Sequence, residues 1–127
     1  MSKTHTLGAL QLAIMNVLWQ EGEATVSHVH GSLLEERGLA PTTIATMLVK
    51  MEKRGVVAHR TEGRKFVYRT TVSEDEVQRS MVGDLKDKLF GGNVAALVSH
   101  LLSEHKVDRD ELAELKALID EKEKGEE

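Results

Sequence analysis

The chain has 127 residues, 40% of them hydrophobic and 30% charged, with a net charge of -4 at pH 7, so we expect a soluble globular protein of one or two small domains. The absence of cysteine excludes disulfides, thiolate metal sites and thiol nucleophiles. The first residues lack the apolar segment of a signal peptide, and the longest apolar run, Val94–Val98, is too short to span a bilayer, so we expect a cytoplasmic protein.

Three helices are predicted in the first half of the chain. Apolar residues recur at helical spacing over Leu7–Leu18, and Gly22 ends this helix. Thr25 is predicted to cap a second helix. The only proline, Pro41, suits the first turn of a third helix, where its missing N–H is harmless, and Gly55 ends that helix.

A β-hairpin is predicted next. The runs Val56–Thr61 and Lys65–Thr70 have the composition of strands, and Glu62-Gly63-Arg64 forms a short turn between them. Three short helices followed by a hairpin is the element order of a winged helix-turn-helix domain. We therefore expect such a domain at residues 1–72.

The second half, residues 73–127, is predicted to contain three further helices. A capping box opens the first at Ser73, and Gly91-Gly92 ends it. The second begins near Val94, and Asp108 caps the third, whose charged end is expected to fray. The expected fold is mainly α with a small β-hairpin, an N-terminal winged helix-turn-helix followed by a three-helix C-terminal dimerisation region.

Charge is distributed unevenly along the chain. Residues 1–72 contain nine Lys and Arg against six Asp and Glu, whereas residues 73–127 contain eight against fifteen. The segment Lys50–Arg69 holds seven basic residues and only two acidic ones, Glu52 and Glu62. A basic block inside an acidic protein indicates an anionic partner that contacts one face. The alternative is a solvated surface without a partner.

The third predicted helix and the hairpin tip carry the candidate contact residues. The inner stripe of the helix is predicted to be Ile44, Met47, Leu48 and Met51. The opposite face then presents Thr42, Thr43, Thr46, Lys50 and Lys53. Small hydroxyl groups let the backbone approach a DNA groove, and the lysines would contact phosphates. Arg64 and Lys65 at the hairpin tip would contact a neighbouring phosphate backbone or the minor groove, so double-stranded DNA is the predicted partner.

The C-terminal helices predict a surface for self-association. They carry wide apolar stripes in a segment with a single aromatic residue, and below about 60–70 residues a lone core is marginal. A homodimer would bury these stripes, whereas in the alternative they fold back onto the first half of a monomer. The predicted dimer contacts are Leu85, Leu89, Phe90, Leu97, Leu101, Leu112, Leu115, Leu118 and Ile119.

Catalysis is not predicted. The chain has no Gly-rich phosphate loop, no His-Glu-x-x-His and no nucleophile elbow, and we expect no cofactor, no metal and no small-molecule substrate. Two other functions stay open: a winged-helix module that binds proteins, or a regulator that responds to metal or pH through histidines. The spacing of His28 with His30, and of His100 with His105, avoids the i,i+4 pairing that is typical of helical zinc sites.

A series of short segments, none unique by itself, has a quite specific order and spacing. The segments are Leu7-Gly8, Met15, Leu18-Trp19, Thr25-Val26, Val29-His30, Ala40–Thr46, Lys53-Arg54-Gly55, Gly63-Arg64, Tyr68, Val72-Ser73-Glu74, Leu89–Gly92, Ala96-Leu97-Val98 and Asp110-Glu111-Leu112. In this series the chain resembles, over nearly its whole length, the penicillinase-repressor family of winged-helix transcription regulators (BlaI, MecI and CopY type).

The resemblance implies a homodimeric repressor whose winged-helix domains bind a palindromic operator and whose C-terminal helices dimerise. By position, the base-contacting helix of the family corresponds to Thr42, Thr43, Ala45 and Thr46. The methicillin-resistance branch has basic side chains at the positions of Thr42 and Ala45. Here a bidentate contact to guanine is lost, and Ala45 offers only a methyl group.

The resemblance also implies a route of induction. In the β-lactamase branch a membrane metalloprotease sensor cleaves an Asn-Phe bond in the fifth helix, and the corresponding bond of this chain is His100-Leu101. The copper-responsive relatives end in paired Cys-x-Cys motifs, which this chain lacks, so copper sensing of that kind is not expected.

Overall fold

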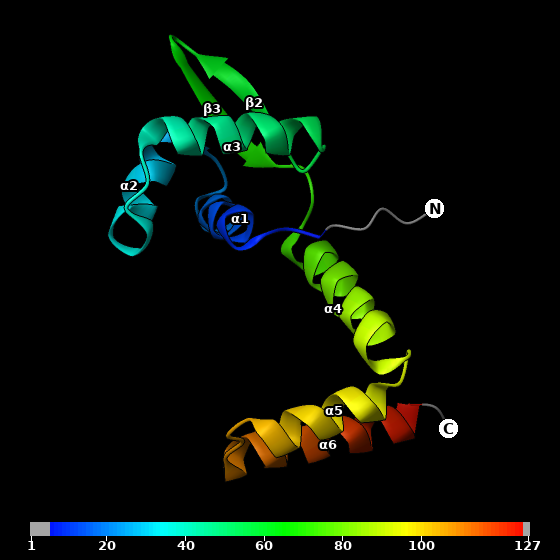
Figure 1. The fold of residues 1–127 in the computed structure, drawn as a ribbon. Coiled ribbons are helices and arrows are strands. Elements are labelled where there is room, and N and C mark those ends of the chain that lie inside the picture. Colours follow the sequence, from blue (N-terminus) through cyan, green and yellow to red (C-terminus); the bar gives the residue numbers. More distant parts are fainter. Residues whose placement is uncertain (1–5, 126–127) are drawn as a thin grey trace. The chain divides into compact units, whose positions relative to one another are not determined.

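The structure is a computed structural model of the chain and describes residues 6–125. Its helices are α1 (Ala9–Glu21), α2 (Val26–Arg37), α3 (Pro41–Lys53), α4 (Glu74–Phe90), α5 (Val94–Glu104) and α6 (Arg109–Gly125), and its strands are β1 (Ala24–Thr25), β2 (Val57–Glu62) and β3 (Lys65–Thr70) (Figure 1). The predicted class, mainly α with a small β element, is confirmed.

The chain divides into two compact units, with the boundary between Asp84 and Leu85 inside α4. The N-terminal unit contains α1, α2, α3, the sheet and most of α4, and the C-terminal unit contains the end of α4 with α5 and α6. None of the helices in residues 6–125 combines the length and the apolar character needed to cross a bilayer.

The sheet has three strands, one more than the predicted hairpin. β3 is central and pairs antiparallel with both neighbours, in the order β1-β3-β2. In the additional strand, β1, Ala24 pairs with Tyr68 and Thr25 pairs with Val67. A strand of two residues is too short to show an alternation of apolar and polar residues, so the sequence pattern does not reveal it.

The β2–β3 hairpin closes in a two-residue turn, Gly63-Arg64, because Glu62 pairs with Lys65. Glu62, predicted to lie in the turn, is instead the last residue of β2. Gly63 has a φ of 63°, which residues with a Cβ atom rarely adopt. This tight turn places Arg64 and Lys65 at the tip of the hairpin.

Four helices begin with a side-chain cap. Thr25, Ser73, Asn93 and Asp108 each accept a hydrogen bond from a backbone N–H of the first turn of α2, α4, α5 and α6, at 3.2, 3.0, 3.0 and 2.8 Å, respectively. These caps satisfy N–H groups that have no partner within the helix. α3 differs, because its N-cap residue is Ala40, whose side chain accepts no hydrogen bond.

The charged end of α6, for which fraying is predicted, is helical as far as Gly125, and residues 126–127 lie outside the described residues. Lys122 and Lys124 lie in its last turn, where positive charge interacts favourably with the helix dipole.

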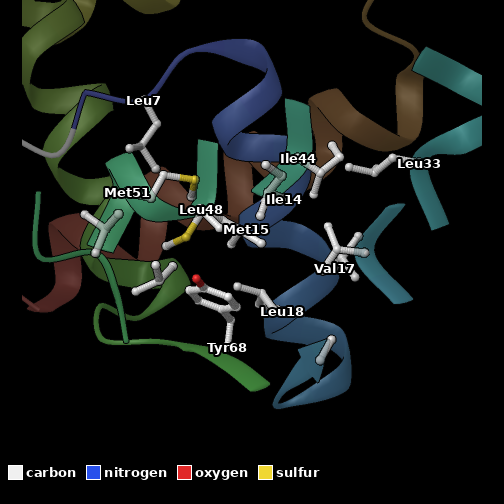
Figure 2. Packing of buried hydrophobic residues seen from close by; sticks show 14 of the residues in the cluster. Leu7, Ile14, Met15, Val17, Leu18, Leu33, Ile44, Leu48, Met51 and Tyr68 are labelled. Carbon is white, nitrogen blue, oxygen red and sulfur yellow. The ribbon is translucent and has the colours of Figure 1, made fainter. Parts of the chain in front are cut away.

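Buried hydrophobic side chains form the core of the N-terminal unit (Figure 2). Its largest fully buried members are Ile14, Met15, Leu18, Val29, Ile44, Leu48, Met51 and Val57. They come from α1, α2, α3 and β2, so α3 is packed against several elements at once. Of the predicted inner residues of α3, only Met47 is partly buried rather than buried. Trp19 Nε1 donates to the carbonyl oxygen of Val72 at 3.0 Å and thereby holds the end of α1 to the segment before α4.

Leu48 and Val49 are neighbours in α3 with opposite environments, because Leu48 is fully buried and Val49 is 46% exposed. We expect Leu48→Ala to lower the free energy of unfolding of the N-terminal unit by about 2–5 kcal/mol, since it removes contacts and leaves a cavity. Val49→Ala is the matched control and should change this free energy by less than about 0.5 kcal/mol. Urea unfolding followed by the fluorescence of the single tryptophan, Trp19, measures both, and equal effects would contradict the assigned inner face.

Candidate nucleic-acid interface

The side of α3 opposite the core is exposed. Solvent reaches Thr42, Thr43, Thr46, Lys50 and Lys53, whereas Ala45 is half-buried. This arrangement follows from the helical period, because burying Ile44, Leu48 and Met51 turns the positions between them outward. The structure therefore brings the predicted groove contacts and two predicted phosphate contacts onto one helix face.

One further residue of this face was missed by the sequence analysis. Thr42, Ala45, Thr46 and Val49 recur at the spacing i, i+3, i+4 and i+7, so they form one stripe along α3. Val49 is 46% exposed although it follows two apolar residues in the sequence. Counting helical positions onward from Thr42 is the signal that would have found it.

The two remaining predicted phosphate contacts lie at the hairpin tip. Arg64 and Lys65 are both exposed, and with Thr25, Val26, Ser27 and Phe66 they line a hollow of about 280 Å³ beside the start of α2. Two cations and two hydroxyl groups give this hollow a composition that suits an anion. Within residues 6–125, no ion pair engages Lys50, Lys53, Arg64 or Lys65.

Two other arginines of the basic block are bound within the fold. Arg54 donates from Nη1 to Gln11 Oε1 at 3.1 Å and from Nη2 to the carbonyl oxygen of Thr6 at 2.7 Å, which ties the end of α3 to the segment before α1. Arg60 on β2 contacts Glu23 at 2.6 Å and Glu62 at 2.7 Å. The hydrogen bonds that Arg60 makes with these two carboxylates raise its pKa, and the hydrogen bond from Arg60 lowers the pKa of Glu23.

The acidic residues of the block also have internal partners. Glu62 pairs with Arg60, and Glu52 of α3 lies 2.6 Å from Nδ1 of His59 on β2. The His59 ring stacks on Phe66 with centroids 4.2 Å apart. Burial raises the pKa of the neighbouring Tyr68 phenol, and the Glu52 carboxylate adds to this effect. The contact between Glu52 and His59 joins α3 to the hairpin, so the exposed face of α3 and the hairpin tip belong to one packed unit.

The predicted dimer residues lie in the C-terminal unit, where neither α5 nor α6 has a buried residue. Leu85, Leu89, Leu101, Leu112, Leu118 and Ile119 are exposed, and Phe90, Leu97 and Leu115 are half-buried. Between α5 and α6 lies a mainly apolar hollow of about 340 Å³, whose lining includes Val98, Leu101, Leu102, Leu115 and Leu118.

The histidines are separated along the chain. His28 lies 3.4 Å from Glu21, and His30 Nε2 lies 2.9 Å from the carbonyl oxygen of Leu39. The rings of His100 and His105 have centroids 6.4 Å apart. Within the described part of the chain, no three His, Cys, Asp or Glu residues are grouped so that they would hold a metal ion. The residues of the predicted protease-sensitive bond, His100 and Leu101, are exposed on α5.

This chain is similar in sequence and fold to known repressors. A family model described as penicillinase repressor matches residues 7–121. The transcriptional regulator BlaI of Mycobacterium tuberculosis (strain CDC 1551 / Oshkosh) is 33% identical over 127 aligned residues, covering 98% of this chain and 91% of that protein. The penicillinase repressor of Bacillus licheniformis is 26% identical over 121 residues, covering 95% and 94% of the two proteins.

A solved structure extends the likeness to the fold. It is the solution structure of the monomeric form of Bacillus licheniformis BlaI in complex with the blaP half-operator. That chain is 32% identical to this one, and the two superpose with a TM-score of 0.51 over 60% of this chain and 93% of that chain.

The pair of Arg60 with Glu23 can be tested by titration. Because hydrogen bonds from Arg60 lower the pKa of Glu23, we expect Arg60→Ala to raise that pKa toward the ordinary value of a glutamate. Arg54→Ala is the control, since it removes another guanidinium of the basic block that bonds to Gln11 and Thr6 instead. NMR titration of the Glu23 carboxyl carbon measures the effect, and an unchanged value in Arg60→Ala would show that the pair is not formed.

Proposed function

The chain belongs to the penicillinase repressor family, and from this premise we propose that it is a transcriptional repressor that binds a palindromic DNA operator as a homodimer. Its relatives in the family are transcriptional repressors and not enzymes. The observation that carries the proposal is the exposed face of α3, where a stripe of small side chains is followed by lysines without an ion-pair partner among residues 6–125.

In the proposed complex, α3 enters the major groove. The groove is about 12 Å wide, which matches the diameter of an α-helix with its side chains. Thr42, Thr43, Ala45 and Thr46 face the base edges, and Lys50 and Lys53 contact phosphates on the groove wall. Arg64 and Lys65 at the hairpin tip contact the neighbouring backbone. The half-operator bound to the Bacillus licheniformis relative supports DNA as the partner.

The proposed dimer forms through the C-terminal unit. α5 and α6 expose large apolar side chains, among them Leu101, Leu118 and Ile119, and have no buried residue of their own. Two helices in this state lack a core, so a second copy that covers the apolar side chains is the simplest way to stabilise them. A two-fold dimer also matches the symmetry of a palindromic operator. The acidic charge of residues 73–127 favours keeping this unit away from DNA.

The remaining parts of the proposal rest on the family resemblance. The repressor acts in the cytoplasm, where the operator is accessible. A membrane metalloprotease sensor is its proposed inducing partner, and the exposed segment at His100-Leu101 is the proposed target of cleavage.

The roles of the contact residues can be separated by DNA-binding measurements. We expect Lys50→Ala and Arg64→Ala to weaken binding to all sequences alike and to reduce the slope of log K against log salt by about 0.9 for each lost phosphate contact. Thr46→Ala should instead reduce the difference in binding affinity between operator DNA and random DNA. Lys116→Ala, an exposed lysine of α6, is the matched control. Gel-shift titrations at several salt concentrations measure these effects, and unchanged binding in all three variants would refute the assigned roles.

The dimer can be tested with Leu118, which is 61% exposed on α6. Leu118→Asp leaves the core of the N-terminal unit intact but places a charge in the proposed interface, so we expect the dimer dissociation constant to rise by about 100-fold or more. Leu34→Asp, at a 49% exposed leucine of α2, should leave the dimer intact. Sedimentation equilibrium measures both, and a wild-type chain that stays monomeric at micromolar concentration would contradict the proposal.

A further inference from the structure

The outward stripe of α3 has an unusual composition for a surface that reads DNA. Its members are Thr42, Ala45, Thr46 and Val49, and none has the long amide or guanidinium group that makes two hydrogen bonds to one base. All four side chains instead carry methyl groups. Val49 has the largest apolar side chain of the four and is 46% exposed.

The place of Val49 is not explained by the stability of the fold. Its side chain is not part of the buried core, unlike the adjacent Leu48. A β-branched residue also has a lower helix propensity than alanine, so an exposed valine within α3 is less favourable than the alternatives. Its exposed position leaves the side chain of Val49 available for a contact outside the chain.

The chemistry of the major groove identifies that contact. Guanine is read by arginine or lysine, adenine by asparagine or glutamine, and thymine by apolar contact with its C5-methyl group. In unmodified DNA thymine is the only base with a methyl group on this edge. We propose that Val49 packs against the C5-methyl group of a thymine in each half-site and thereby determines part of the operator sequence. This inference rests on the proposed function.

The geometry of α3 supports this placement. Val49 follows Thr42 by seven residues, and positions i, i+3, i+4 and i+7 are those with which the recognition helix of homeodomains reads the major groove. Lys50 and Lys53 lie beside and one turn beyond Val49 on the exposed side of the helix. If Lys50 and Lys53 contact the phosphates at the edge of the major groove, the side chain of Val49 lies inside that groove.

Replacing thymine by uracil tests the proposal, because it removes only the methyl group and leaves base pairing intact. Duplexes bound by the wild-type protein are first selected from a random pool to define the operator, and each thymine of a half-site is then replaced by deoxyuridine in turn. For the wild type we expect one replacement to weaken binding by about fourfold, the effect of burying one methyl group. In Val49→Ala the same replacement should have almost no effect, while the salt dependence of binding stays unchanged.

Leu34→Ala is the control variant, because it shortens an exposed aliphatic side chain of α2 and should retain the full dependence on thymine. Equal binding of thymine and uracil duplexes at every position would overturn the inference. Equal losses in the wild type and in Val49→Ala would also overturn it, since another residue would then read the methyl group. Failure to select any preferred sequence has a separate meaning, because it would overturn the proposed function itself.

Discussion

The burial of one stripe of α3 is the constraint on which the rest of the molecule depends. Ile44, Leu48 and Met51 are almost completely removed from solvent, and they pack together with side chains of α1, α2 and β2. Since side chains recur every 3.6 residues in a helix, this packing also decides which residues face outward. The threonines, Val49 and the lysines are therefore presented together by the core, and a rotation of α3 would expose buried leucine and methionine.

Within the described part of the N-terminal unit, hydrogen bonds and ion pairs engage some charged residues of the basic block and leave others exposed without a partner. Arg54 and Arg60 are held by hydrogen bonds to other elements, and Glu52 and Glu62 are held by His59 and Arg60. The described cations of the block that lack such a partner are Lys50 and Lys53 on α3, Arg64 and Lys65 at the hairpin tip, and Arg69 on β3. The C-terminal unit shows the opposite arrangement, with apolar side chains exposed and acidic charge in excess.

Local patterns in the sequence predicted most of the fold. The apolar spacing of α3, the caps at Thr25 and Ser73 and the glycine turn at Gly63 each depend on residues close together in the chain. Features that depend on distant partners were missed: β1 exists only through its pairing with β3, and Arg54 meets Thr6 across 48 positions. Val49 was overlooked because it follows two apolar residues, so its hydrophobicity gave no sign of its exposure. The roles of the individual contact residues and the dimer remain predictions.

The uncapped start of α3 has a consequence for how stability and binding are balanced. Replacing a Ser, Asp or Asn cap by alanine typically lowers stability by about 1 kcal/mol, so Ala40 leaves α3 less stable than a polar residue would. A carboxylate at this position would accept a hydrogen bond from an N–H of the first turn and repel a phosphate that approaches the same helix end. Pro41 has no N–H and the Thr43 N–H donates to the Ala40 carbonyl oxygen at 3.1 Å, so the alanine leaves the Thr42 N–H available at the proposed DNA surface. The start of α3 is thus less stable than it could be, while its affinity for an anionic ligand is preserved. A variant with a carboxylate cap at residue 40 would gain stability and lose affinity for DNA.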